Sequence, residues 1–267
     1  MTLKCIIKRT LLRMIYPVHL FFFHLSGTKK RNRVRLDNLK DKYKGKRCFV
    51  ICNGPSLRAA DLTKLHINGD ITIAMNMIAR IYDKTPWRPT VLSATDDCVF
   101  NKINKDLVEK CECGVKLYDS KRYLRSLKAK GYIVYLQFNE SRKLLDYPQF
   151  DIDASKPLPS IGTSAYSMIE FAGFLGCKEV YLLGCDMSYA VNLNRDGSIT
   201  YNDSGQNHFY AKDKDQMTHL RPAPTWELQT AFEAAEKLSA QYDMKIFNAT
   251  RGGKLEAFER VDFDSLF

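Results

Sequence analysis

Short apolar runs, many of them rich in β-branched residues, recur along this chain and alternate with longer segments of helical character. The runs that predict strands are 47–52, 71–75, 90–94, 115–118, 132–136, 179–183 and 245–247. The segments that predict helices are 57–65, 165–175 and 226–242. Strands that alternate with helices are typical of an α/β fold with a doubly wound, mostly parallel sheet. We therefore predict a Rossmann-like domain, and the sequence has no internal repeat.

Two stretches lack this alternation. Residues 139–159 are polar and predict a long loop, which we expect to form a lid-like insertion. Residues 190–225 are polar and are expected to be irregular. A basic segment precedes the first strand, so we divide the chain into an N-terminal arm, 1–46, and a single domain, 47–267.

The positive charge of the chain is concentrated in the N-terminal arm. The net charge is +11, and residues 1–47 hold 14 of the 41 Lys and Arg but only two of the 30 acidic residues. This leaves 27 basic and 28 acidic residues from position 48 onward, so the domain is close to neutral. A near-neutral domain argues against nucleic acid as a partner.

The arm combines apolar and basic segments. Residues 10–26 are apolar but are interrupted by Arg13 and Pro17, and they fall short of the ~20 apolar residues of a spanning helix. A basic cluster, 29–35, follows. This pattern predicts peripheral binding to the cytoplasmic face of an anionic inner membrane. The alternative is a helix packed on the domain or on a partner subunit, and the exposed aromatic residues also make a homo-oligomer plausible.

The eight cysteines indicate a reducing compartment. Four of them, at 48, 52, 177 and 185, lie in or beside apolar runs, where cysteine is usually a small buried residue. The pair at 111 and 113 has no second pair at the spacing of a zinc site. We therefore predict free thiols, a cytoplasmic location and no structural metal.

The first strand ends in a turn with the composition of a ligand site. This turn is Asn53-Gly54-Pro55-Ser56, and a predicted helix follows it. Gly54 allows close approach of a ligand to the backbone, and Ser56 is expected to cap the helix. The free N–H groups of a helix N-terminus commonly bind phosphate.

Polar residues follow several of the predicted strands. In doubly wound sheets the ligand lies beyond the carboxyl ends of the strands, so residues at these ends are expected to meet in one crevice. They are Asn53, Asn76, Asp96 with its neighbours Thr95 and Asp97, Gly184 with Asp186, and Asn248.

Three motifs together resemble two related families. They are Asn53–Leu57, the helix after Gly162-Thr163-Ser164, and Gly176–Asp186. The families are the 6-hydroxymethylpterin pyrophosphokinase-like domains and the Campylobacter-type lipooligosaccharide sialyltransferases. The segment 248–255 also resembles the first family, and the resemblance runs from about 47 to 260.

The resemblance to the sialyltransferases implies a metal-independent site for a CMP-sugar. It implies that the ribose and phosphate contact Asn53, Gly54, Ser56 and Asn76. The segment Gly162-Thr163-Ser164 would cradle the nucleotide, and Tyr189 would stabilise the leaving phosphate. No cofactor is required under this interpretation.

The sequence departs from the sialyltransferases at the general base. Their motif has two histidines, and the second is the base; here His208 and Phe209 match its first half, but Lys212 occupies the position of the base. Histidine has a pKa suited to this role, so His208 or His219 is the candidate, with Asp213 as a further possibility. Asp186 is retained as a further candidate catalytic residue.

These observations favour a glycosyltransferase that uses a nucleotide-sugar donor to modify a cell-surface glycan, such as lipopolysaccharide or capsule, on a lipid-linked acceptor. The first alternative is a diphosphotransferase of the pterin pyrophosphokinase type, with Mg²⁺ at Asp96 and Asp97. The chain lacks a Gly-x-x-x-x-Gly-Lys-Ser/Thr loop to hold ATP. The second alternative is a non-catalytic nucleotide-binding scaffold.

Overall fold

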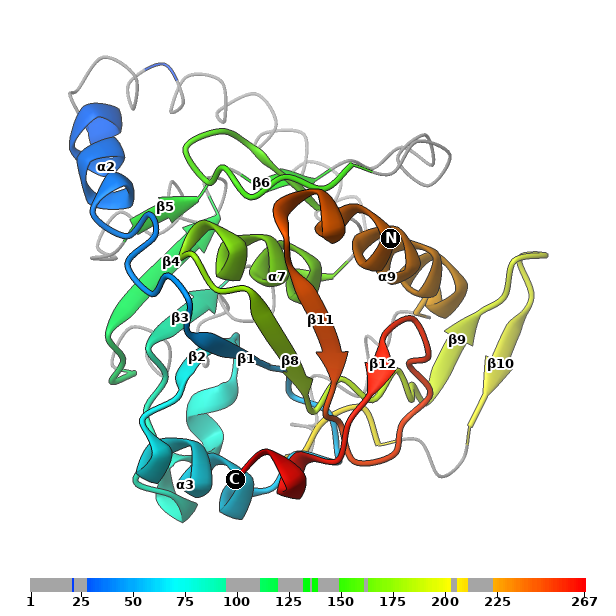
Figure 1. Ribbon diagram of the computed structural model, residues 1–267. Helices are drawn as coiled ribbons and strands as arrows, with labels where there is room; N and C mark the ends of the chain where they lie inside the picture. Colours follow the sequence, from blue (N-terminus) through cyan, green and yellow to red (C-terminus); the bar gives the residue numbers. More distant parts are fainter. Residues whose placement is uncertain are drawn as a thin grey trace, which may run out of the picture.

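In the part of the chain that the structure describes, the main sheet consists of eight parallel strands (Figure 1). The computed structural model describes residues 21, 28–94, 111–119, 132–134, 136–138, 149–160, 163–202, 206–210 and 223–267. The strand order is β12-β11-β8-β1-β2-β3-β4-β5. The strands are β1 (Arg47–Ile51), β2 (Ile71–Met75), β3 (Val91–Ala94), β4 (Val115–Asp119), β5 (Tyr132–Val134), β8 (Glu179–Leu183), β11 (Lys245–Asn248) and β12 (Glu259–Arg260). The predicted α/β, Rossmann-like fold is confirmed.

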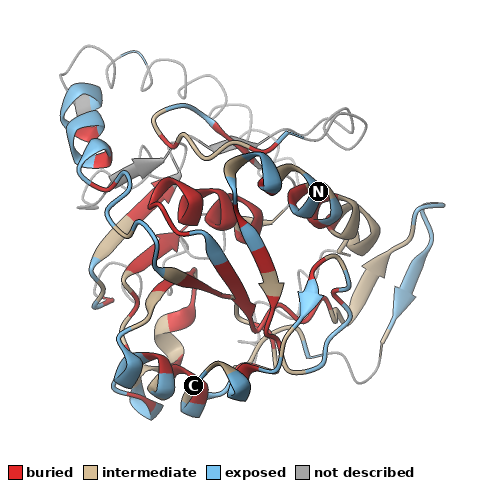
Figure 2. Cartoon of the chain, in the orientation of Figure 1, coloured by how far each residue is buried: buried red, intermediate tan, exposed pale blue. Residues whose placement is uncertain are grey.

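Helices cover both faces of this sheet, and each face has its own apolar core. Along β1, Cys48 and Val50 belong to one core cluster, whereas Phe49 and Ile51 belong to the other. Alternate residues of a strand point to opposite faces, so this division is the signature of a strand buried on both sides. Figure 2 shows the buried residues concentrated in the central strands and in the helix above them.

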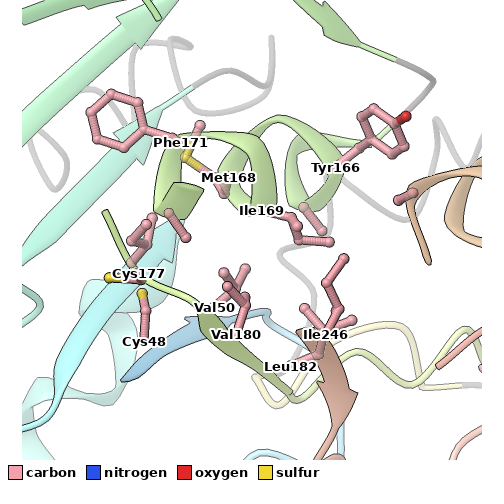
Figure 3. Close-up of a cluster of buried hydrophobic side chains, with 14 of the residues drawn as sticks. Cys48, Val50, Tyr166, Met168, Ile169, Phe171, Cys177, Val180, Leu182 and Ile246 are labelled. Carbon is pink, nitrogen blue, oxygen red and sulfur yellow. The ribbon is translucent and has the colours of Figure 1, made fainter. Parts of the chain in front are cut away.

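The first core lies under two helices, α7 (Ser164–Phe174) and α9 (Thr225–Ser239). Figure 3 shows Ile169 of α7 facing Val50, Val180 and Leu182. Helix α7 is buried along its length, which explains its nearly continuous apolar sequence. The second core lies under α3 (Ala59–Asn68) and the 3₁₀ helix η1 (Ile78–Lys84).

One carboxyl group is enclosed within the first core. Glu170 of α7 is fully buried, and its Oε1 accepts a hydrogen bond from the N–H of Asp151 at 3.0 Å. Within the part of the chain that the structure describes, its Oε2 has no hydrogen-bond partner. Burial raises the pKa of Glu170 well above its ordinary value, because the charged form cannot be solvated there.

The described part of the N-terminal arm packs on the domain at its end. Helix α2 (Thr28–Asp37) carries exposed basic residues, but Leu36 and the following Leu39 are buried in the first core. The N–H groups of Asp41 and Tyr43 donate to the carbonyls of Phe174 and Leu175. Among the described residues, no helix has the length and apolar character needed to cross a bilayer. Most of the apolar segment 10–26 lies outside the described residues.

The structure also contains strands that the sequence did not predict. A hairpin of β9 (Val191–Leu193) and β10 (Ile199–Tyr201) lies within the segment expected to be irregular, and it projects from the body in Figure 1. Its turn is closed by the N–H of Asn194, which donates to the carbonyl of Ser198 at 2.8 Å. A strand of three residues flanked by polar residues is too short for its alternation of apolar and polar positions to be recognised in the sequence.

A second small sheet also departs from the prediction. Strand β6 (Leu136–Phe138) pairs in parallel with β7 (Leu158–Ser160), which lies at the end of the stretch expected to be a loop. Two short 3₁₀ segments complete the fold, η3 (Ala240–Tyr242) and η4 (Phe263–Leu266). The six described cysteines are free thiols, as predicted.

Candidate functional site

The candidate site is a cavity of about 250 Å³ at the carboxyl ends of β1, β2 and β8. From β1 the chain proceeds outward through β2, β3, β4 and β5 on one side, whereas β8, β11 and β12 extend the sheet on the other side. The strand order therefore reverses between β1 and β8. Such a reversal leaves a crevice between the diverging connections, which is where ligands bind in open parallel sheets.

Eighteen of the described residues line this cavity. They are Cys52, Asn53, Gly54, Met75, Asn76, Thr163, Ser164, Ala165, Gly184, Cys185, Asp186, Met187, Ser188, Tyr189, Asn207, His208, Leu228 and Phe232. The mixture of apolar walls and a few convergent polar groups is typical of a small-molecule site. No Lys or Arg occurs among these described lining residues.

The side chain of Asn53 offers a hydrogen-bond acceptor in the cavity wall. Its Nδ2 donates to the carbonyl of Met75 at 3.0 Å, which fixes the orientation of the amide. Its Oδ1 is buried and has no hydrogen-bond partner among the described residues. A buried acceptor without a partner is costly, so a donor supplied by a ligand would stabilise this arrangement.

The rest of the turn is held by Asp186 at the end of β8. The hydroxyl of Ser56 donates to Asp186 Oδ2 at 2.9 Å, and the Ser56 N–H donates to the same oxygen at 3.4 Å. A Cβ at Gly54 would overlap with the Asp186 carboxylate and the Gly184 carbonyl, so the close approach requires glycine. Burial raises the pKa of Asp186, and the hydrogen bonds from Ser56 oppose this rise.

Ser56 does not cap the following helix. Helix α3 begins at Ala59, its N-cap is Arg58, and no side chain caps it. The prediction that Ser56 caps this helix is therefore wrong, because the hydroxyl is used by a residue 130 positions away.

The helix that has a side-chain cap beside the cavity is α7 and not α3. Thr163 is its N-cap and accepts a hydrogen bond from the N–H of Ala165, and Thr163, Ser164 and Ala165 all line the cavity. The positive end of the helix dipole therefore faces the site. This arrangement suits an anion such as a phosphate in a cavity whose described lining has no basic side chain.

Two lining residues adopt left-handed backbone conformations that are unusual for non-glycine residues. Asn76 and Met187 each have φ of 54°. Asn76 follows β2, and its N–H donates to the carbonyl of Ser93 at 2.7 Å. Such conformations cluster at ligand sites, where the surrounding structure holds them in place.

A protonated phenol and two thiols lie beside Asp186. Burial raises the pKa of Tyr189 well above its ordinary value, so its hydroxyl stays protonated at neutral pH. The thiols of Cys52 and Cys185 interact with each other, and this contact together with burial raises the pKa of Cys52. Tyr189 and Cys52 therefore present neutral donors at neutral pH.

The segment 206–210 forms one wall of the cavity. The N–H of Phe209 donates to the carbonyl of Asn53 at 2.9 Å, and the N–H of Ala190 donates to Asn207 Oδ1 at 2.7 Å. These bonds attach the segment to the turn after β1 and to the residue that precedes β9. His208 consequently lines the cavity.

The structure brings together most of the residues that the sequence singled out. The cavity lining includes Asn53, Gly54, Asn76, Thr163, Ser164, Gly184, Asp186, Tyr189 and His208. Pro55 and Ser56 belong to the same turn as Asn53 but are not among the lining residues. Asp96, Gly162 and His219 lie outside the described residues.

Asn248 does not reach the cavity, contrary to the prediction. Its Nδ2 donates to the carbonyl of Leu255, and its Oδ1 accepts from the N–H of Thr250. Thr250 Oγ1 accepts from the N–H of Cys185, and the N–H of Lys254 donates to the carbonyl of Asp186. The segment 248–255 therefore stabilises, through these hydrogen bonds, the residues that follow β8.

Sequence reasoning missed several lining residues. Leu228 and Phe232 come from the first turns of α9, and no pattern distinguishes them from its core residues. Asn207 lies next to His208, and its role in holding Ala190 depends on a contact that sequence alone does not reveal. Among the described residues, no group of His, Cys, Asp or Glu is arranged to hold a metal ion.

A second hollow of about 350 Å³ lies elsewhere, between β7 and the end of α9. Its lining includes Phe150, Asp151, Pro157 and Gln241 but none of the predicted site residues. The cavity at the β1/β8 reversal is smaller but contains the convergent polar groups, so we take it as the candidate site.

Comparison with known proteins adds two solved structures. MAf glycosyltransferase from Magnetospirillum magneticum AMB-1 is 15% identical and has a TM-score of 0.49, over 90% of this chain and 39% of that one. The sialyltransferase CstII from Campylobacter jejuni, in complex with the substrate analogue cytidine-5'-monophosphate, is 18% identical. Its TM-score is 0.47, over 81% of this chain and 87% of that one. This chain thus spans about two fifths of the length of MAf. No protein-family model and no curated protein matches the chain.

Proposed function

We propose that this protein is a glycosyltransferase that binds a CMP-sugar-like donor in the cavity at the β1/β8 reversal and transfers the sugar to a cell-surface glycan such as lipopolysaccharide or capsule. The observation that carries the proposal is the buried, unpartnered Oδ1 of Asn53 in a cavity that also faces the N-terminus of α7. An acceptor for a ribose hydroxyl and a dipole for a phosphate are what a nucleotide requires.

The remaining lining residues suit the transfer step. The protonated Tyr189 hydroxyl can donate to the leaving phosphate as negative charge develops on it. His208 can accept the proton of the acceptor hydroxyl. Under this proposal the reaction needs no cofactor, and His219 remains the alternative base.

The basic surface of the arm supports the proposed acceptor and location. Helix α2 presents exposed Lys29, Lys30, Arg31, Arg33 and Arg35. A cationic surface of this kind favours an anionic bilayer and therefore a lipid-linked acceptor on the cytoplasmic face of the inner membrane. Self-association of the protein is part of the same proposal.

Nucleotide titration by isothermal calorimetry tests the donor. We expect CMP to bind without metal, and Asn53→Ala to weaken CMP binding roughly tenfold, equivalent to the loss of about one buried hydrogen bond. Asn38→Ala, at an exposed site on the arm, is the matched control and should bind as the wild type does.

Other outcomes favour the alternatives. Binding of ATP only with Mg²⁺, and not of CMP, would favour diphosphotransfer, with Asp96 and Asp97 as the metal ligands. CMP binding without sugar transfer from CMP-sugars to lipooligosaccharide would favour the scaffold.

A further inference from the structure

The imidazole of His208 is stacked on another ring of the same segment. The ring centroids of His208 and Tyr210 are 5.0 Å apart, and the ring planes differ by 8°. This is the geometry of an offset parallel stack, in which each ring restricts the rotation of the other. His208 is one of the residues that line the cavity, so the stack fixes the plane of an imidazole that belongs to the cavity wall.

Tyr210 is itself held from two directions. The ring of Phe209 meets it edge-on, with centroids 5.0 Å apart and planes at 82°. The guanidinium carbon of Arg80 lies 4.9 Å from the Tyr210 centroid, within the range of a cation–π contact. Both Phe209 and Tyr210 also pack against the second core.

Arg80 and Tyr210 belong to segments that are attached to the turns bordering the cavity. Arg80 belongs to η1, which follows Asn76 almost directly, and its N–H donates to the carbonyl of Met77 at 3.1 Å. The N–H of Phe209 is bonded to the Asn53 carbonyl. The turns after β1 and β2 therefore set the positions of Tyr210 and Arg80 relative to the site.

We propose that Tyr210 and Arg80 are positioning residues that hold His208 for proton abstraction from the acceptor hydroxyl, an inference that rests on the proposed function. In that step the hydroxyl proton passes to an imidazole nitrogen. An oxygen electron pair then forms the bond to the anomeric carbon of the sugar. The bond from that carbon to the phosphate oxygen breaks, and its electron pair leaves with the nucleotide.

This role is needed because of where His208 lies. An imidazole on an irregular segment rotates about two side-chain bonds, and a base works only when one ring nitrogen points at the hydroxyl. The flat stack on Tyr210 removes much of this freedom before the substrate binds, and Arg80 fixes the ring on which it stacks.

Nuclear magnetic resonance of the whole protein tests the stack without any substrate. Ring stacking shifts the imidazole protons upfield, and with five histidines in the chain the His208 signals are assignable from His208→Gln. We expect upfield signals that persist in Tyr210→Phe and move downfield in Tyr210→Leu. Tyr201→Leu, at an exposed tyrosine on β10, is the matched control. Signals of His208 that do not respond to Tyr210→Leu would overturn the proposal.

Transfer kinetics test the consequence. Tyr210→Leu and Arg80→Met should lower kcat about tenfold or more, less than the roughly 100-fold loss expected without a general base, while the Kd of CMP is retained. Tyr210→Phe and Arg80→Lys should recover most of kcat. A lost stack with unchanged kcat would overturn the positioning role and leave the glycosyltransferase proposal intact. Wild-type protein that transfers no sugar would overturn both.

Discussion

Asp186 Oδ2 accepts hydrogen bonds from the hydroxyl and the N–H of Ser56, at 2.9 and 3.4 Å. The two residues are 130 positions apart, and they join the turns that follow the neighbouring strands β1 and β8. Asp186 was singled out by sequence as a candidate catalytic residue. Its contacts in the structure favour a different contribution, which is to hold the Asn53–Ser56 turn in the shape that presents Asn53.

Removing the Asp186 carboxylate should loosen this turn. We expect Asp186→Ala to lower the free energy of unfolding by about 1–3 kcal/mol, because the Ser56 donors lose their acceptor. Ser56→Ala should cost less, and the double variant should show a coupling energy of about 0.5–3 kcal/mol in urea denaturation. Asp196→Ala, in the exposed hairpin turn, is the control. Additive effects of the two substitutions would show that the contact contributes little.

The backbone of Gly54 lies close to the Asp186 side chain and the Gly184 carbonyl. We expect Gly54→Ala to destabilise the protein by about 1–3 kcal/mol and to abolish CMP binding, because its Cβ would overlap with the Asp186 carboxylate and the Gly184 carbonyl. Thermal denaturation and calorimetry measure the two effects. Gly45→Ala is a matched control, since no atom lies near its added Cβ and it carries only the cost of a positive φ of 75°. Loss of CMP binding in Gly45→Ala, or its retention in Gly54→Ala, would contradict this explanation.

The buried Glu170 predicts a pH dependence of stability. Its pKa in the folded protein is raised above that of the unfolded chain, so the folded state retains a proton that the unfolded state loses. The contribution of Glu170 is therefore fully present below the unfolded pKa, about 4.3, and is lost as pH rises through the folded pKa.

The substitution Glu170→Gln should remove this loss of stability with rising pH. The variant, relative to wild type, should gain stability as pH rises from about 4.3, and the difference should level off above the folded pKa. Urea denaturation at a series of pH values measures it. Glu233→Gln, at an exposed site on α9, should show no such trend. A difference independent of pH would contradict the raised pKa of Glu170.

The exposed basic residues of α2 predict membrane binding. Reversing two charges with Lys29→Glu and Lys30→Glu should weaken binding to vesicles of anionic lipid by roughly 2 kcal/mol or more, at about 1 kcal/mol for each basic residue lost. Sedimentation with phosphatidylserine vesicles measures this effect, and neutral phosphatidylcholine vesicles are the control. Equal binding of the wild-type protein to both kinds of vesicle would argue against electrostatic attraction between the basic residues of α2 and anionic lipid.

The sequence by itself determined the fold class and pointed to the turn at the end of β1 as a candidate ligand site. Runs of apolar residues such as 48–51 and 180–183 predict strands buried on both faces, because each such strand must be apolar on both sides. The turn at Asn53 and the helix cap at Thr163 are local features, encoded within a few neighbouring residues. Asn53 and Gly54, expected from the turn, and Thr163, expected from the family resemblance, line the cavity in the structure.

The tertiary structure decided which strands are neighbours and which polar groups meet. No feature of the neighbouring sequence indicates that β8 pairs with β1. The Ser56–Asp186 hydrogen bond and the position of Asn248 outside the cavity could therefore not be predicted. The same holds for the stack of His208 on Tyr210 and its contact with Arg80. Periodicity reports which face of an element is buried, whereas a contact between distant residues depends on pairing and packing across the whole chain.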